Sequence, residues 1–192
     1  SVAGRQIPNS LNKSIEMMWV KNRDSVDNWA VYHKGLNGGT NPQDYFLKLN
    51  TNDAESNSIN NWNDQAPTST HFIIDDDNRV NKDGDQFIAM LFASVDGISK
   101  VGYYDGSNSA QTITTGFQPR FLIVKSVTDT EPWIVLDTTR GWGSGNDNYL
   151  QIHNSDAQSS WDMGAPTSTG FSLPVTAEVN TSSRKYIYYA HA

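Results

Sequence analysis

The sequence predicts an all-β fold: a jelly-roll-like sandwich of about twelve short antiparallel strands, built from two sequence repeats with pseudo-twofold symmetry. Three observations support it. Apolar and aromatic residues alternate with a period of two, as in Met17–Lys21. Turn-forming segments rich in Asn, Asp and Gly separate these runs, and no stretch has the period of an amphipathic helix. The third observation is an internal duplication.

The duplication is visible as an ordered series of matches. Residues 15–21 match residues 119–125 at a spacing of 104 (Lys21 to Lys125), and a tryptophan follows eight residues later in both copies. The pentapeptide Ala-Pro-Thr-Ser-Thr occurs at 66–70 and again at 165–169, at a spacing of 99 (Ala66 to Ala165). Only small gaps separate the matches, so chance is a poor explanation.

The candidate strands combine this alternation with β-branched and aromatic residues. They cover residues 15–21, 28–33, 45–50, 70–75, 86–93, 99–104, 110–114, 120–126, 132–137, 148–153, 169–173 and 184–190.

One compact domain is expected over residues 1–192, made of a repeat at 15–93, a connector at 94–118 and a repeat at 119–192. A single copy has too few strands to cover its own sheet edges, so the two copies are expected to cover each other. The connector alternates like a strand and contains no flexible linker, so we expect it to belong to the fold.

Composition excludes several function classes. The net charge is −7 and the sequence pI is about 4.9, which disfavours binding to a phosphate backbone, so no nucleic acid partner is expected. The longest apolar runs are only a few residues, so no membrane insertion is expected. There is no cysteine, which excludes disulfides and thiolate sites.

Several segments resemble a duplicated domain of large tail and virion-associated proteins of tailed phages, particularly marine ones. The segments that carry the resemblance are Trp19–Asp24, Ala66–Thr70, Phe92–Gly102, Gly116–Phe121, Asp137–Gly145 and Tyr186–Ala190. The resemblance covers nearly the whole chain. That family is uncharacterised, so it implies a location in the virion, extracellular when mature, and it supplies no catalytic residues.

Tryptophan is the first residue type to consider for binding, because sandwich lectins stack indole rings on sugars. Trp19, Trp29 and Trp133 lie within strand patterns and are expected in the core, and Trp62 and Trp161 are expected to be packing anchors. Trp142 occurs only in the second copy, in a loop rich in turn residues. The candidate ligand-binding residues are Arg140, Trp142, Asn146, Asp147 and Tyr149. Alternatively, the indole folds back over the sandwich and Arg140 pairs with Asp137.

No catalytic, metal or cofactor site is expected. The acidic run Asp75–Asp77, with Asn78 and the following Asn81–Asp85, resembles a calcium loop. Its counterpart in the second copy, residues 175–178 and 181–184, has only one carboxylate, so a solvated hairpin is favoured. No zinc-binding His pair or nucleophile elbow is present in the sequence. Glycoside hydrolysis needs two carboxyl groups held at a defined separation, about 5 Å or about 6.5–9.5 Å, which the fold and not the sequence pattern sets.

The leading hypothesis is therefore a non-catalytic binding module of a phage tail or virion protein that attaches to host surface glycan. A structural, decoration or assembly domain that contacts other virion proteins is the first alternative, and a polysaccharide-degrading enzyme is the second. Homo-oligomers are compatible with all three hypotheses, because no heptad or collagen-like repeat in the sequence enforces one oligomeric state.

Overall fold

A computed structural model describes residues 2–175 and 177–192, and it is an all-β sandwich with a few single-turn helices. The chain divides into two compact units, Ser1–Ala93 (unit 1) and Ser94–Ala192 (unit 2). All strand pairs within the named sheets are antiparallel. Among the described residues, none of the helices has the length and apolar character that a membrane crossing requires.

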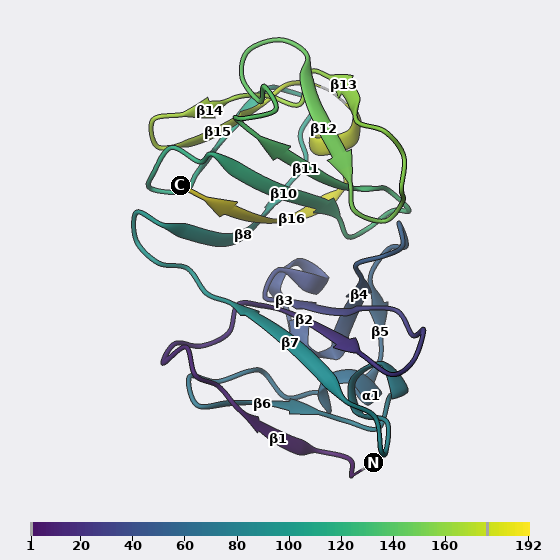
Figure 1. Cartoon of the computed structure of the whole chain (residues 1–192). Helices are drawn as coiled ribbons and strands as arrows, with labels where there is room; N and C mark the ends of the chain where they lie inside the picture. Colours follow the sequence, from purple (N-terminus) through teal and green to yellow (C-terminus); the bar gives the residue numbers. More distant parts are fainter. Residues whose placement is uncertain (1, 176) are drawn as a thin grey trace. The chain divides into compact units, whose positions relative to one another are not determined.

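Unit 1 has a five-stranded sheet in the order β5-β4-β3-β2-β7 and a separate pair, β1-β6 (Figure 1). Its strands are β1 (Arg5–Pro8), β2 (Met17–Asn22), β3 (Ala30–His33), β4 (Tyr45–Lys48), β5 (Ser56–Asn57), β6 (His71–Ile74) and β7 (Phe87–Phe92). Its helices are η1 (Leu36–Gly39), η2 (Pro42–Asp44), α1 (Ile59–Trp62) and α2 (Asn78–Asn81).

Unit 2 has a six-stranded sheet in the order β13-β12-β11-β10-β16-β8 and a three-stranded sheet in the order β14-β15-β9 (Figure 1). Its strands are β8 (Ser99–Asp105), β9 (Gln111–Thr114), β10 (Phe121–Ser126), β11 (Trp133–Asp137), β12 (Asp147–Gln151), β13 (Ser159–Trp161), β14 (Pro166–Thr167), β15 (Gly170–Leu173) and β16 (Lys185–His191). Its one helix among the described residues is α3 (Ala177–Asn180).

Each unit has its own hydrophobic core, because period-two alternation turns alternate side chains of both its sheets inward. In unit 1, Val20 of the large sheet and Phe72 of the small pair belong to one buried cluster. In unit 2, Val124 and Phe171 belong to the corresponding cluster. Every residue of each cluster lies within a single unit. One domain was expected over residues 1–192, and the chain instead forms two compact units, each with its own core.

All twelve expected strands are present, with ends that differ by a few residues. The four strands that the sequence did not indicate are β1, β5, β13 and β14, each of two to four residues. They are too short for a pattern of alternating apolar and polar residues to be recognised in the sequence, and they are strands because they pair with neighbouring strands. The acidic run Asp75–Asp77 leads into helix α2 rather than a hairpin, because Asp77 caps the helix by accepting the Arg79 N–H at 2.8 Å.

The repeat spacing aligns the strand orders of the two units. A spacing of 104 places β2 on β10, and a spacing of 99 places β6 on β15 and β7 on β16. Ile7 of β1 pairs with Phe72 and Ile113 of β9 pairs with Phe171, so β1 corresponds to β9 at a spacing of 106 (Ile7 to Ile113). The expected connector, residues 94–118, therefore supplies β8 and β9 to unit 2. The pseudo-twofold relation between the halves stays a prediction.

Candidate functional site

The loop around Trp142 is part of the core of unit 2. The Trp142 side chain is 3% exposed, and its ring centroid lies 6.4 Å from that of Phe171. Tyr149 is 6% exposed and belongs to the same cluster. Stacking on a ligand requires a free ring face, and neither side chain offers one. The indole folds back over the sandwich, as the alternative interpretation of the sequence had it.

The polar candidates of this loop stabilise its conformation. Buried Asp147 accepts the N–H groups of Gly143 at 2.8 Å and Met163 at 2.9 Å through its two carboxylate oxygens. Burial raises the pKa of Asp147, and these two hydrogen bonds offset only part of that effect. Arg140 Nε lies 2.7 Å from Asp137 Oδ2. Arg140 and Asn146 are the two exposed residues among the five candidates.

The remaining tryptophans divide between core and surface. Trp62 and Trp133 are each 1% exposed, whereas Trp19 and Trp29 are half-buried. Trp161 was expected to be a packing anchor like Trp62, and that prediction is wrong, because its side chain is 57% exposed on the edge strand β13. In each unit, one buried indole belongs to a residue outside the strands of the large sheet. In unit 1 it is Trp62 of α1, and in unit 2 it is Trp142 of the β11–β12 loop.

A carboxylate cluster surrounds Arg184, directly before the first residue of β16 in unit 2. Arg184 pairs with Asp129 at 2.7 Å and with Glu131 at 2.6 Å. Half-buried Glu178 lies close to Glu131, and burial, followed by the charge of Glu131, raises the pKa of Glu178, against a hydrogen bond with Tyr149. Among residues 2–175 and 177–192, no three His, Asp or Glu side chains are grouped to hold a metal ion.

Glu178→Gln is expected to stabilise the protein at neutral pH. Because the folded-state pKa lies above the ordinary value of 4.5, the fold binds the proton more tightly than the unfolded chain does. The free energy of unfolding therefore falls as pH rises through the raised pKa, and the variant removes this loss. Thermal unfolding from pH 4 to pH 7 checks it, with exposed Asp96→Asn as control. A variant curve parallel to the wild-type curve would contradict the assignment.

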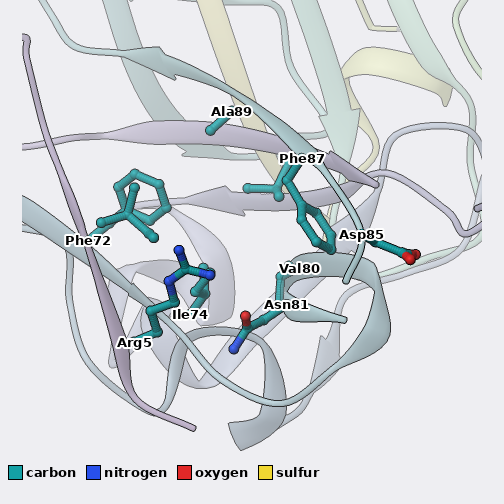
Figure 2. Close-up of a pocket in the computed structure, with 10 residues that line it drawn as sticks. Arg5, Phe72, Ile74, Val80, Asn81, Asp85, Phe87 and Ala89 are labelled. Carbon is teal, nitrogen blue, oxygen red and sulfur yellow. The ribbon is translucent and has the colours of Figure 1, made fainter. Parts of the chain in front are cut away.

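Unit 1 contains a cavity of about 320 Å³ between its two sheets, at the lower end of the range for ligand sites, roughly 300–1,000 Å³. Figure 2 shows Phe72, Ile74, Val80 and Phe87 around it, with the Asp85 carboxylate pointing away. The lining comes from β1, β2, β6, α2, β7 and the loop before β7. The full set is Arg5, Ile7, Val20, Phe72, Ile74, Val80, Asn81, Asp85, Phe87 and Ala89.

Strand β7 borders this cavity and forms one edge of the five-stranded sheet. The Arg23 N–H donates to Gln86 O at 2.8 Å, which makes these two residues a hydrogen-bonded pair between β2 and β7. Backbone groups alternate along an antiparallel strand, so those of Phe87, Ala89 and Leu91 point away from β2. Within the part of the chain that the structure describes, no strand pairs with that side of β7. We call these backbone groups the open edge.

Two charged residues, Asp85 and Arg5, are among those that line the cavity. Asp85 accepts hydrogen bonds from Asn22 at 2.8 Å and Ser25 at 2.8 Å, and it pairs with Lys82 at 3.1 Å. The hydrogen bond from Asn22, followed by that from Ser25, lowers the pKa of Asp85. Arg5 is exposed, and Figure 2 shows its side chain reaching among the lining residues. The Asp85 carboxylate is therefore already held by two hydrogen bonds and an ion pair.

Sequence reasoning missed this site because it treated both copies as equivalent. The signal was available: Gly102–Asp105 has no counterpart aligned within the first copy. Among the described residues, β8 lies beside the second repeat and no strand lies at the equivalent place beside the first, so the two units have different surfaces. Only the pairing order shows that the difference falls on β7.

Comparison with curated proteins and with solved structures gave no match. A family model described as Domain of unknown function (DUF7483) matches residues 1–192, and the chain therefore belongs to that family.

Proposed function

We propose that this chain is a non-catalytic structural module that joins other protein chains of a phage tail or virion through the open edge of unit 1. The observation that carries this proposal is the combination of an unpaired strand edge with an adjoining apolar cavity. A strand edge binds polypeptide, because its N–H and C=O groups need the complementary groups of another backbone. The phage context comes from the sequence resemblance.

Exposed apolar side chains on the same strand support a protein partner. Ile88 is 44% exposed and Met90 is 37% exposed, on the face of β7 opposite the cavity. Soluble proteins protect edge strands with charges, especially lysine, and β7 carries no charged residue. The strand is therefore suited to association rather than to solvent.

The isolated chain is expected to self-associate weakly through this edge, in a concentration-dependent way. Replacing Ile88 and Met90 together with Lys should abolish the association, because lysines on an edge strand oppose pairing. Sedimentation velocity over a range of protein concentrations measures it. The matched control replaces Ser159 and Ser160 with Lys on β13, an edge strand of unit 2. A chain that is monomeric throughout, or association that the β7 variant leaves unchanged, overturns the proposal.

Attachment to host surface glycan is the second candidate function, and exposed Trp161 favours it. The indole lies beside exposed Ser159 and Ser160 on β13, so a sugar ring has access to its face. If this surface binds host envelope polysaccharide, Trp161→Ala should weaken binding by about tenfold or more. Exposed Tyr103→Ala on β8 is the control, and a glycan array is the measurement. Equal binding by both variants rejects this site.

A further inference from the structure

Unit 2 shows what covers the strand that corresponds to β7. That strand is β16, which pairs with β8 along its whole length, from Lys185 opposite Asp105 to His191 opposite Ser99. The Gly106 N–H donates to Arg184 O at 2.8 Å, and alternation then directs the backbone groups of Tyr186 and Tyr188 toward β8. At the repeat spacing of 99, these residues correspond to Phe87 and Ala89 of the open edge. The same backbone groups are thus paired in one unit and open in the other.

Tyr104 of β8 is the residue that seals the core of unit 2 at this edge. It is 8% exposed, and its ring stacks on Tyr186 with centroids 5.0 Å apart. It also contacts Phe171 at 6.4 Å and Tyr188 at 6.2 Å. Its hydroxyl donates to Val179 O at 2.7 Å. The aromatic ring fills the space between the sheets, and the polar tip is satisfied by a helix carbonyl.

The residues around Tyr104 are the repeat counterparts of the cavity lining in unit 1. Phe171, Val179 and Tyr186 correspond to Phe72, Val80 and Phe87 at the spacing of 99, and all three counterparts line the cavity. The cavity therefore lies where the fold places the side chain of Tyr104 in unit 2. Its position, rather than its volume alone, indicates the kind of group that fits.

We propose that the open edge and the cavity of unit 1 bind an added antiparallel strand of the β8 pattern, with a tyrosine side chain seated in the cavity. This inference rests on the proposed function, because it specifies the partner of the same edge. The tyrosine lies opposite Phe87, and its hydroxyl donates to the carbonyl of Val80, as that of Tyr104 does to Val179.

Charge complementarity favours a carboxylate directly after that tyrosine. In unit 2, the Asp105 carboxylate pairs with Lys185 at 2.8 Å, and the Asp105 carbonyl accepts from Gln111 Nε2 at 3.0 Å. Unit 1 has Gln86 in place of Lys185 and Arg5 in place of Gln111. In unit 1 the cation is therefore Arg5, the counterpart of Gln111, whose side chain contacts Asp105 at the end of β8 in unit 2. A guanidinium can bind both a carbonyl and a carboxylate.

The residue two positions before the tyrosine differs between the units. In unit 2 it is Gly102, where a Cβ would clash with the ring of Tyr188. Unit 1 has Ala89 in place of Tyr188. A methyl group therefore replaces the tyrosine ring that leaves room only for glycine on the neighbouring strand. The added strand is therefore expected to carry an apolar side chain opposite Ala89.

The test supplies the strand by fusing a copy of residues 94–106 directly before Ser1 of the full chain. Ser1 corresponds to Ser107 at the spacing of 106, so the added segment enters in the register of β8. Tethering gives a high effective concentration, which makes docking measurable even for a weak strand. Hydrogen exchange of the Ala89 and Leu91 amides is expected to slow by about tenfold or more. A Gly102→Leu version of the added copy should protect these amides more strongly.

Matched variants separate the parts of the proposal. Tyr104→Ala in the added copy should lose the protection, because the cavity is then left unfilled. Ala89→Tyr in the chain should exclude the Leu version and accept the Gly version, reproducing the pairing of Tyr188 with Gly102. Met90→Tyr, on the opposite face of β7, should change neither result. Each variant is also checked for unaltered exchange of the β3 amides, which reports that unit 1 is folded.

The outcomes differ from those of the self-association experiment. Absence of protection with both the Gly and the Leu version overturns the added strand, while association through Ile88 and Met90 leaves the proposed function standing. Equal protection with Tyr104→Ala overturns the tyrosine assignment. A free peptide of residues 94–110 that competes with self-association supports the added strand. Dimers that persist at saturating peptide favour β7 pairing between two copies and overturn it.

Discussion

Replacing Trp142 with Ala is expected to destabilise unit 2 by about 3–5 kcal/mol, the cost of removing a large aromatic side chain from a packed core. The indole is 3% exposed and lies against Phe171, so the surrounding strands cannot collapse onto the space that it leaves. A loss of this size is a large part of the stability of a small domain, about 5–15 kcal/mol.

Urea unfolding followed by hydrogen exchange measures the loss for each unit, with amides of β10 and β11 reporting unit 2 and amides of β2 and β3 reporting unit 1. Trp161→Ala is the matched control, because its 57% exposed indole should cost less than about 0.5 kcal/mol. If the two tryptophan variants were equally stable, the loop would not be part of the core. Retained glycan binding by a folded Trp142→Ala variant would agree with the buried position.

Replacing Asn180 with Ala is expected to cost about 3 kcal/mol, and replacing its repeat counterpart Asn81 about 1 kcal/mol. The Asn180 side chain is buried and makes four hydrogen bonds with the segment that joins β8 to β9 and with Pro174. Its Oδ1 accepts from Ser107 N at 2.9 Å and Gln111 Nε2 at 2.6 Å, and its Nδ2 donates to Ser109 O at 3.0 Å and Pro174 O at 2.8 Å.

Asn81 makes one such bond, from its Nδ2 to Val2 O at 2.9 Å. The two variants therefore compare one position of the repeat with and without a neighbouring β8. The same urea and exchange measurements apply, and exchange of the β8 amides should accelerate only in Asn180→Ala. Equal losses for the two variants would show that the β8–β9 segment gains little from Asn180. In that case the contrast between the edges of the two units would need another explanation.

The sequence predicted the strands well because their physical cause is local. Period-two alternation between Met17 and Lys21, or between Tyr186 and Ala190, follows from side chains pointing to alternate faces of a sheet. The same reasoning failed at Trp161, where a repeat position was taken as evidence of burial. Trp62 is buried from a helix, whereas Trp161 lies on a short edge strand, so equal spacing did not give equal surroundings.

The candidate loop illustrates a second limit. Trp142 was correctly singled out as a residue without a counterpart in the first copy. The residue types of its loop, however, are the same whether the indole binds a ligand or packs in the core. Gly141 has a φ of 104°, and Asp147 holds the N–H of Gly143, and these features turn the chain so that the indole points inward. Such a reversal depends on contacts across the loop, and residue types alone do not specify it.

What the sequence by itself determined is the duplicated all-β character of the chain, because alternation, turn residues and internal repeats are properties of order along the chain. The tertiary structure decided which strand lies beside which. It placed β8 against β16 and gave β7 no such neighbour among the described residues, and it left a cavity where unit 2 holds Tyr104. Strand adjacency arises from contacts between residues distant in the sequence, so two similar repeats can end with unlike edges.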